Sequence, residues 1–282
     1  MAASSPCIPM ARVTDPALAP LAAGPCIRLQ AAGLVVEVAP QAGGRLSGIR
    51  FGDVDWLVGP DAGFPGTIAW GCYPMLPWAG RVRGGIFSFE GQRHTLPVTL
   101  GAHAIHGVAL DRPWRLLEQG PCELSMALSL EEDPRWPFGG DAIQRIALDR
   151  DRLRMELTFV AGHRAMPNPV LGWHPWFRKA ERVGFTPSAF YPRDHAGIAT
   201  LPLAEPPGPL DDCYINTSAA VLERAGQRLV LSASCDHWVL YDETPHATCL
   251  EPQTGPPDAF NLRSDVLSPG GQLHAWFELV FS

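Results

Sequence analysis

The 282-residue chain lacks the surface charge of a nucleic-acid-binding protein and the long apolar runs of a membrane protein. Its formal net charge is −7, and its densest basic stretch, residues 145–154, is interrupted by Asp149 and Asp151. Binding to a phosphate backbone requires a basic face, so we expect no nucleic-acid partner. No run of about 18 apolar residues occurs, so the sequence predicts no membrane span.

Paired cysteines are also missing. The seven cysteines are scattered without a CxxC pair, which is typical of reduced thiols in a cytosolic protein rather than of a disulfide framework. The N-terminus has no charged start followed by an apolar block, so we predict a flexible tail over residues 1–30 and not a signal peptide. We therefore expect a cytoplasmic protein, either a monomer or a homodimer.

Sequence motifs that hold nucleotides or metals are absent as well. No GxGxxG follows an expected strand, and neither GxxxxGK[ST] nor a GxSxG elbow occurs. His103 and His106 are spaced by three residues, but no HExxH motif or cysteine pair supplies further ligands. The sequence predicts no cofactor and no metal ion.

Helical periodicity is missing, and short strands take its place. Apolar residues never recur at three-and-four spacing over three turns, and the chain holds 29 prolines and 28 glycines. Residues 153–159 alternate strictly between apolar and polar, which predicts a strand with one buried face, paired with residues 144–148. The pattern indicates an all-β fold, a large antiparallel β-sandwich or barrel, in a single domain over residues 31–282.

Two stretches carry groups suited to proton transfer. In LEPQTGPPDAFN, residues 250–261, Glu251 follows an apolar run and precedes a loop rich in proline and glycine, so we expect it at a strand end, placed as a base. In LGWHPWF, residues 171–177, His174 shares a strand face with Gly172, which leaves room, and Trp176, which suits the flat face of a sugar ring. The alternatives are a solvated glutamate and a core histidine.

Three further stretches offer polar side chains for ligand binding. Arg81 lies in the rigid loop YPMLPWAGRVR and can fork onto paired oxygens, and His106 lies in GAHAIHG. Asp211 and Asp212 are adjacent in PLDDCYI, so they point to opposite sides of an extended chain and only one can serve a given site. The alternatives are a surface ion pair for the arginine, a structural role for the histidine and a loop cap for the aspartate.

The ordered series LPWAGR, HAIHG, GWHPWF, LDDCY and LEPQTGPPDAFN resembles the aldose 1-epimerase (galactose mutarotase) family, from about Gly33 to the end of the chain. The resemblance implies a large antiparallel β-sandwich of the galactose mutarotase-like supersandwich type. It also implies that Glu251 is the general base and that His174, as an imidazolium, is the general acid.

The resemblance further implies the residues that bind substrate. Arg81 and His106 correspond to residues that contact the sugar, and Trp176 belongs to the sugar-binding pocket. Asp211 matches the substrate-binding aspartate better than Asp212 does. Two positions depart from the family. Gly80 stands where asparagine is common, and Trp176 stands where many members have tyrosine, so the sugar preference is open.

The activity implied by the resemblance is interconversion of the α and β anomers of a free aldose, by acid–base ring opening and closure without cofactor or metal. One alternative is a hexose-6-phosphate 1-epimerase-like enzyme, in which Arg81, Arg83 and Arg112 would hold the phosphate. Another is a non-catalytic sugar-binding protein of the same fold.

Overall fold

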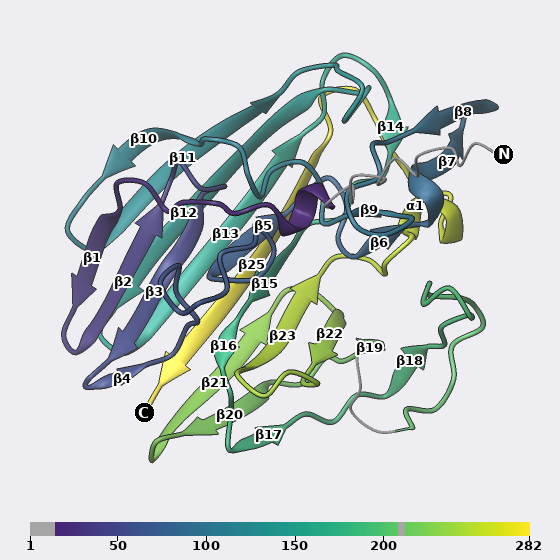
Figure 1. Cartoon of the computed structure of the whole chain (residues 1–282). Coiled ribbons are helices and arrows are strands. Elements are labelled where there is room, and N and C mark those ends of the chain that lie inside the picture. The colour runs from purple at the N-terminus through teal and green to yellow at the C-terminus, as the bar shows by residue number, and fades with distance from the viewer. Residues whose placement is uncertain (1–14, 208–211) are drawn as a thin grey trace, which may run out of the picture.

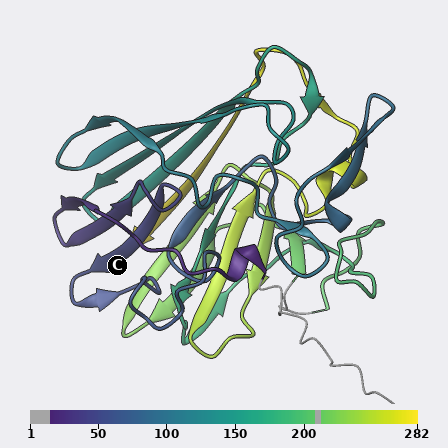
Figure 2. The same ribbon diagram turned by 45° about the horizontal axis from the view of Figure 1, so that its top comes forward.

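A computed structural model describes residues 15–207 and 212–282. The chain forms two large antiparallel sheets, of eleven and eight strands, and three two-stranded ones. Figures 1 and 2 show the two large sheets as the body of the molecule. The predicted all-β antiparallel sandwich is confirmed.

The eleven-stranded sheet contains the strands that will hold the site. Its order is β1-β2-β3-β5-β15-β23-β22-β19-β18, with β4 paired to β3 and β16 paired to β23. The strands are β1 (Ile27–Ala31), β2 (Leu34–Ala39), β3 (Arg45–Phe51), β4 (Val54–Asp55), β5 (Cys72–Met75), β15 (Gly172–Pro175), β16 (Phe177–Arg178), β18 (Ala189–Tyr191), β19 (Asp212–Ile215), β22 (His237–Tyr241) and β23 (Ala247–Gln253).

The eight-stranded sheet has the order β10-β11-β12-β13-β25-β21-β20-β17. Its strands are β10 (Arg115–Gln119), β11 (Glu123–Leu130), β12 (Gly140–Asp149), β13 (Arg152–Val160), β17 (Arg182–Gly184), β20 (Ala220–Arg224), β21 (Gln227–Ala233) and β25 (Gln272–Phe281). The predicted pairing of residues 144–148 with 153–159 is confirmed, since β12 and β13 form a regular antiparallel hairpin.

The smaller elements gather mainly at one end of the molecule (Figure 1). They are the strand pairs β6 (Arg81–Val82) with β9 (Ala104–Ile105), β7 (Ile86–Phe89) with β8 (Gln92–Thr95) and β14 (Met166–Pro167) with β24 (Val266–Leu267), together with the short helices η1 (Pro16–Leu18), η2 (Arg83–Gly85) and α1 (Ala259–Leu262). No helix in the described part of the chain is long and apolar enough to cross a membrane.

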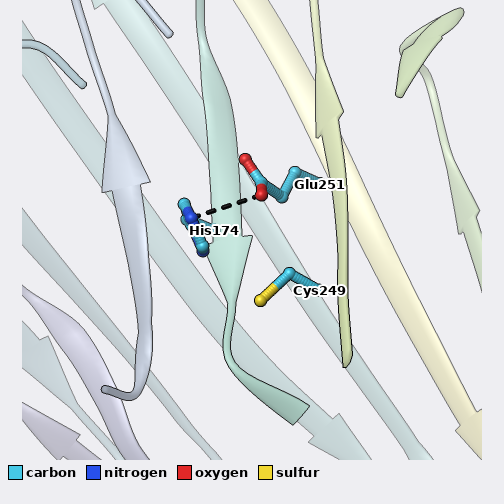
Figure 3. A group of neighbouring side chains, drawn as sticks. All are labelled: His174, Cys249 and Glu251. Carbon is cyan, nitrogen blue, oxygen red and sulfur yellow. Dashed lines mark ion pairs between the residues drawn. The ribbon is translucent and has the colours of Figure 1, made fainter. Parts of the chain in front are cut away.

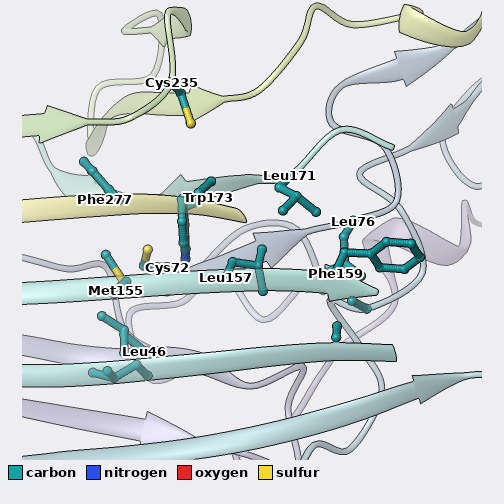
Figure 4. Close-up of a cluster of buried hydrophobic side chains, with 14 of the residues drawn as sticks. Leu46, Cys72, Leu76, Met155, Leu157, Phe159, Leu171, Trp173, Cys235 and Phe277 are labelled. Carbon is teal, nitrogen blue, oxygen red and sulfur yellow. The ribbon is translucent and has the colours of Figure 1, made fainter. Parts of the chain in front are cut away.

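The main core lies between the two large sheets. Met155, Leu157 and Phe159, the apolar positions of the predicted alternation, point from β13 into this core (Figure 4). They face side chains of the other sheet, and Trp173 of β15 packs against Phe277 of β25 with ring centroids 6.0 Å apart.

Side chains alternate across a strand, so the residues next to these core positions face the opposite side of the eleven-stranded sheet. Trp173 and Leu250 belong to the main core. His174 and Glu251, one residue further along β15 and β23, line a cavity on the other face. That outer face carries the candidate site.

Two local expectations differ from the structure. Glu251 lies inside β23 and not at its end, because the pairing of β22 with β23 continues through Pro252 to Gln253. On the other edge of β23, the pairing with β15 is limited to Gly172–Gln253. The missing N–H of Pro252 therefore costs few hydrogen bonds between strands. The boundary expected at residue 31 falls on the last residue of β1, which pairs with β2 along its whole length.

Candidate active site

A cavity of about 290 Å³ lies against the outer face of the eleven-stranded sheet. It brings together five of the six side chains that the sequence singled out: Arg81, His106, His174, Trp176 and Glu251. Asp211, the sixth, lies outside the described residues. Its neighbour Asp212, the open alternative, lines the cavity at the start of β19.

His174 and Glu251 lie in direct contact on neighbouring strands. His174 Nε2 is 3.2 Å from Glu251 Oε1, and both residues are buried, at 5% and 3% exposure. Figure 3 shows Glu251 reaching from β23 across the face of β15 to His174. A histidine and a carboxylate at hydrogen-bonding distance, with one side open to a cavity, can together donate and accept a proton.

Aromatic rings hold the His174 imidazole in place. Its ring stacks on Trp176, with centroids 5.2 Å apart, and on Tyr73, at 4.9 Å, while the His106 ring meets it edge-on at 5.0 Å. Its Nδ1 is buried and has no hydrogen-bond partner among the described residues. Stacking, rather than a second hydrogen bond, therefore fixes the orientation that points Nε2 at Glu251.

Burial lowers the pKa of His174 well below its ordinary value, and His106, where it is protonated, and the charge of Arg45 act in the same direction. The Glu251 carboxylate opposes this effect because it favours the charged imidazole. An imidazolium would also carry an Nδ1 hydrogen without an acceptor. Burial therefore favours the neutral ring over the imidazolium expected for His174 from the family resemblance.

His106 has a defined tautomer. Its Nδ1 accepts a hydrogen bond from the Gly80 backbone N–H at 3.3 Å, so the neutral ring carries its hydrogen on Nε2. Burial and the positive charge of Arg81 lower the pKa of His106 to about 3. His106 therefore remains neutral near pH 7 and presents an N–H donor to a ligand.

The chain path around His106 depends on its glycine neighbour. Gly107 has a φ of +79°, and a Cβ there would lie 1.9 Å from the Leu76 carbonyl oxygen. The HG pair in the sequence thus has a steric cause. By contrast, His103 serves the loop itself, since its Nδ1 accepts from the Gly84 N–H at 3.1 Å.

Arg81 reaches the cavity from β6, which pairs with β9 at Arg81–Ile105. Its guanidinium makes no ion pair with any described residue, so its hydrogen-bond donors are available to a ligand. The preceding Gly80 has a φ of +64°, and a Cβ there would lie 2.7 Å from the Pro257 Cβ. The asparagine common in the family at this position would not fit against Pro257, which itself lines the cavity.

Sequence reasoning missed Arg193. Its Nε donates to Asp212 Oδ1 at 2.8 Å, and both residues line the cavity. Burial raises the pKa of Asp212, while Arg193 acts against that shift. Arg193 stands in a loop without a recognisable motif, so only the folded chain brings it to the site.

The role expected for Gly172 is wrong. A Cβ there would lie 2.9 Å from both the Gln253 Cβ and the Pro252 carbonyl oxygen. The glycine therefore allows β15 and β23 to approach each other, and it does not create room for a ligand. Its effect on the site is indirect, since this approach brings His174 to Glu251.

Among the described residues, one group of side chains could hold a metal ion. The donor atoms of His174, Cys249 and Glu251 all lie within 4.8 Å of one another (Figure 3). This arrangement joins nitrogen, sulfur and oxygen donors from two adjacent strands, and the sequence motifs gave no sign of it.

Fold and cavity together define a class: a large β-sandwich with a His–Glu pair, an aromatic wall and hydrogen-bond donors around a pocket of monosaccharide size. Residues 25–279 match the family model described as aldose 1-epimerase, and the chain belongs to that family. The resemblance seen in the five motifs is confirmed.

Solved structures from several organisms share the fold. A putative aldose 1-epimerase from Escherichia coli K12 has a TM-score of 0.81 and 19% identity, covering 92% of this chain and 99% of that one. A GalM/aldose epimerase homologue from C. elegans has a TM-score of 0.77 and 17% identity, with 92% and 98% covered. A galactose 1-epimerase from Lactobacillus acidophilus has a TM-score of 0.74 and 19% identity, with 91% and 94% covered. No curated protein sequence matches significantly.

Proposed function

We propose that the protein interconverts the α and β anomers of a free aldose, with Glu251 as general base and His174 as general acid. The observation that carries this proposal is the 3.2 Å contact between His174 Nε2 and Glu251 Oε1 on the wall of the cavity. Non-catalytic sugar binding would not need a buried acid–base pair aimed at one point.

In this mechanism the sugar replaces the direct contact between the two side chains. The anomeric hydroxyl and the ring oxygen are both bonded to C1, so the hydroxyl donates to Glu251 while the ring oxygen accepts from His174 Nε2. Glu251 takes the hydroxyl proton, His174 gives its proton, and the ring opens to an aldehyde. Because burial lowers the pKa of His174, its protonated form is a strong acid toward the weakly basic ring oxygen.

After rotation about C1–C2, the ring closes on the other face of the carbonyl, with the two roles reversed. The remaining cavity residues hold the sugar during this step. Arg81 and the Nε2–H of His106 donate to hydroxyls, Asp212 accepts from them, and the indole of Trp176 packs against apolar ring atoms. We assign to Asp212 the substrate-binding role that the family resemblance gave first to Asp211.

Polarimetry tests this proposal directly. Freshly dissolved α-anomers of glucose, galactose, xylose and arabinose should approach equilibrium faster with the protein, and the four rates rank the sugars. Glu251→Gln and His174→Asn should each fold normally and lose at least roughly a hundredfold in rate. Glu243→Gln is the matched control, because Glu243 is an exposed carboxylate on the same cavity. Wild-type rates in either catalytic variant would contradict the assigned roles.

A sugar phosphate is the second candidate substrate, because two arginines, Arg81 and Arg193, line the cavity. Of the three arginines considered from the sequence, Arg83 and Arg112 do not line the cavity, and Arg83 pairs with Asp194 at 2.7 Å. Arg193 is partly neutralised by Asp212. The free sugar is therefore favoured. Strong inhibition by millimolar inorganic phosphate, together with faster conversion of a hexose 6-phosphate, would reverse this preference. Sugar binding without acceleration would indicate a binding protein.

A further inference from the structure

We propose that His174, Cys249 and Glu251 form a binding site for a thiophilic divalent ion such as Zn²⁺, and that such an ion reversibly inhibits the protein. The inhibition rests on the proposed function, whereas the binding does not. Cys249 precedes Glu251 by two residues on β23, so the two side chains point to the same face of the strand. Figure 3 shows both of them extending from β23 toward β15, the strand that carries His174.

The distances suit a small ion after a modest adjustment. Zinc bonds of about 2.0 Å to nitrogen or oxygen and 2.3 Å to sulfur place the ligands of a tetrahedral ion roughly 3.3–3.6 Å apart. His174 Nε2 and Glu251 Oε1 are already 3.2 Å apart, and all three donor atoms lie within 4.8 Å. A shift of about 1 Å at the Cys249 side chain would close the triangle, within the range of a rotamer adjustment.

Charge favours the same ion. A neutral imidazole, a carboxylate and a thiolate add up to two negative charges, which a divalent cation neutralises in a buried setting. Binding releases the proton of the Cys249 thiol to solvent. The Nε2 lone pair of a neutral His174 becomes available to the ion once the ring takes the Nδ1–H tautomer. Mixed sulfur and nitrogen donors select zinc-like ions over Mg²⁺, which prefers oxygen.

The ion has an entrance and an open coordination position. His174 and Glu251 line the cavity, so an ion can reach them from solvent, and a water on the cavity side can complete the tetrahedron. His174 Nδ1 has no hydrogen-bond acceptor among the described residues, so no second hydrogen bond would orient the metal-bound imidazole. Such support commonly contributes 10–100-fold in affinity, so we expect a dissociation constant on the order of micromolar rather than nanomolar.

The test uses the folded wild-type protein and two cysteine variants. Co²⁺ titration followed by absorbance reports thiolate ligation through a sulfur-to-cobalt charge-transfer band, without reference to activity. We expect this band in the wild type and in Cys213→Ala, and its loss in Cys249→Ala. Cys213 is the matched control because it is a buried thiol that lines the same cavity outside the three-residue group. In polarimetric assays, the inhibitory Zn²⁺ concentration should rise at least about tenfold in Cys249→Ala alone.

Absence of the cobalt band in wild-type protein would overturn the site, and so would equal Zn²⁺ sensitivity of Cys249→Ala and wild type. If Cys249→Ala did not fold, His174→Asn would provide the second variant, since it keeps the thiol but removes the nitrogen donor and should weaken Co²⁺ binding. Unchanged Co²⁺ binding in that variant would also count against the site. If the wild type bound Co²⁺ through its thiol but had no epimerase activity, the proposed function would fail and the site would stand.

Discussion

Arg45 is a buried cation that binds backbone oxygens. Its guanidinium stacks on Trp70 and Tyr73, at 4.3 and 4.9 Å from the ring centroids. Burial lowers the pKa of Arg45 to about 10, so it stays charged near neutral pH. It donates at 2.6–2.9 Å to the carbonyls of Ala42, Thr67, Trp70 and Leu110. Because Tyr73 in turn stacks on His174, Arg45 helps to hold the His174 ring in position through Tyr73.

Arg45→Met should lower the free energy of unfolding by about 3–5 kcal/mol, because it leaves buried carbonyls without donors. Urea denaturation measures the loss. Arg152→Met is the control, since Arg152 is half exposed and pairs with Glu278, and it should cost less than about 1 kcal/mol. Similar losses in the two variants would show that the carbonyl network adds little.

His106 couples stability to pH. Its folded pKa is about 3, below the ordinary value of about 6.5, so the unfolded chain binds more protons between these values. Stability therefore rises with pH in this window and falls as pH drops, by up to about 1.4 kcal/mol per unit. His106→Gln should have a shallower dependence in urea denaturation across pH 4 to 7. His163→Gln, at a side chain that is 79% exposed, should keep the wild-type slope; a shallower slope there as well would contradict this account.

At the scale of elements, the LEPQTGPPDAFN motif has two structural roles. Glu251 faces the cavity, whereas Asp258 fixes the following loop onto the β6 segment. Asp258 Oδ1 accepts from the Arg83 N–H at 2.9 Å and from Asn261 Nδ2 at 2.8 Å, and the Asp258 N–H donates to the Arg81 carbonyl at 2.8 Å. Asp258 of the D-A-x-N segment therefore positions the chain that carries Arg81.

Asp258→Ala should raise KM by roughly tenfold and change kcat much less, because it loosens Arg81 without touching the His174–Glu251 pair. Asp258 has a φ of 60°, a conformation that asparagine tolerates. Asp258→Asn also keeps the Oδ1 acceptor, so it should restore most of the affinity. Steady-state kinetics on the best sugar separates the two parameters. An equal fall of kcat in Asp258→Ala would place Asp258 in the chemistry instead.

The sequence predicted elements better than it predicted their neighbours. Alternation of apolar and polar residues along 153–159 indicated β13, because side chains in a strand alternate between the buried and the exposed face. Pairing of β5 with β15 joins residues 72–75 to residues 172–175, and no local pattern encodes that contact. The family motifs supplied the site list, but Arg193 and the buried Cys249 needed the folded chain. Gly172 was misread because its neighbour Gln253 is distant in sequence, and the contact of Gly80 with Pro257 was out of reach for the same reason.

At the scale of the whole molecule, the strands that carry the site also close the main core. Trp173 of β15 packs on Phe277 of the opposite sheet, so the contact between sheets supports the strand that holds His174. Other aromatic contacts cross the same interface, including Phe51 against Phe281 at 5.5 Å. Loss of packing at this interface should therefore also change the position of β15 and of the cavity residue His174 that it carries.

Phe277→Ala should lower the free energy of unfolding by about 3–5 kcal/mol, because it opens a cavity between the sheets. The neighbouring Trp276 faces away from the core and lies against Arg154, so Trp276→Ala should cost clearly less. Thermal or urea unfolding of both variants gives the comparison. Equal losses would mean that the two faces of β25 contribute alike.

The alternation of β15 and β23 has an evolutionary consequence. Residues 173 and 250 serve folding, whereas 174, 249 and 251 face the pocket side, so mutation can vary one set while selection holds the other. A lineage could therefore change its ligand without rebuilding its scaffold. That freedom is consistent with a TM-score of 0.81 surviving at 19% identity.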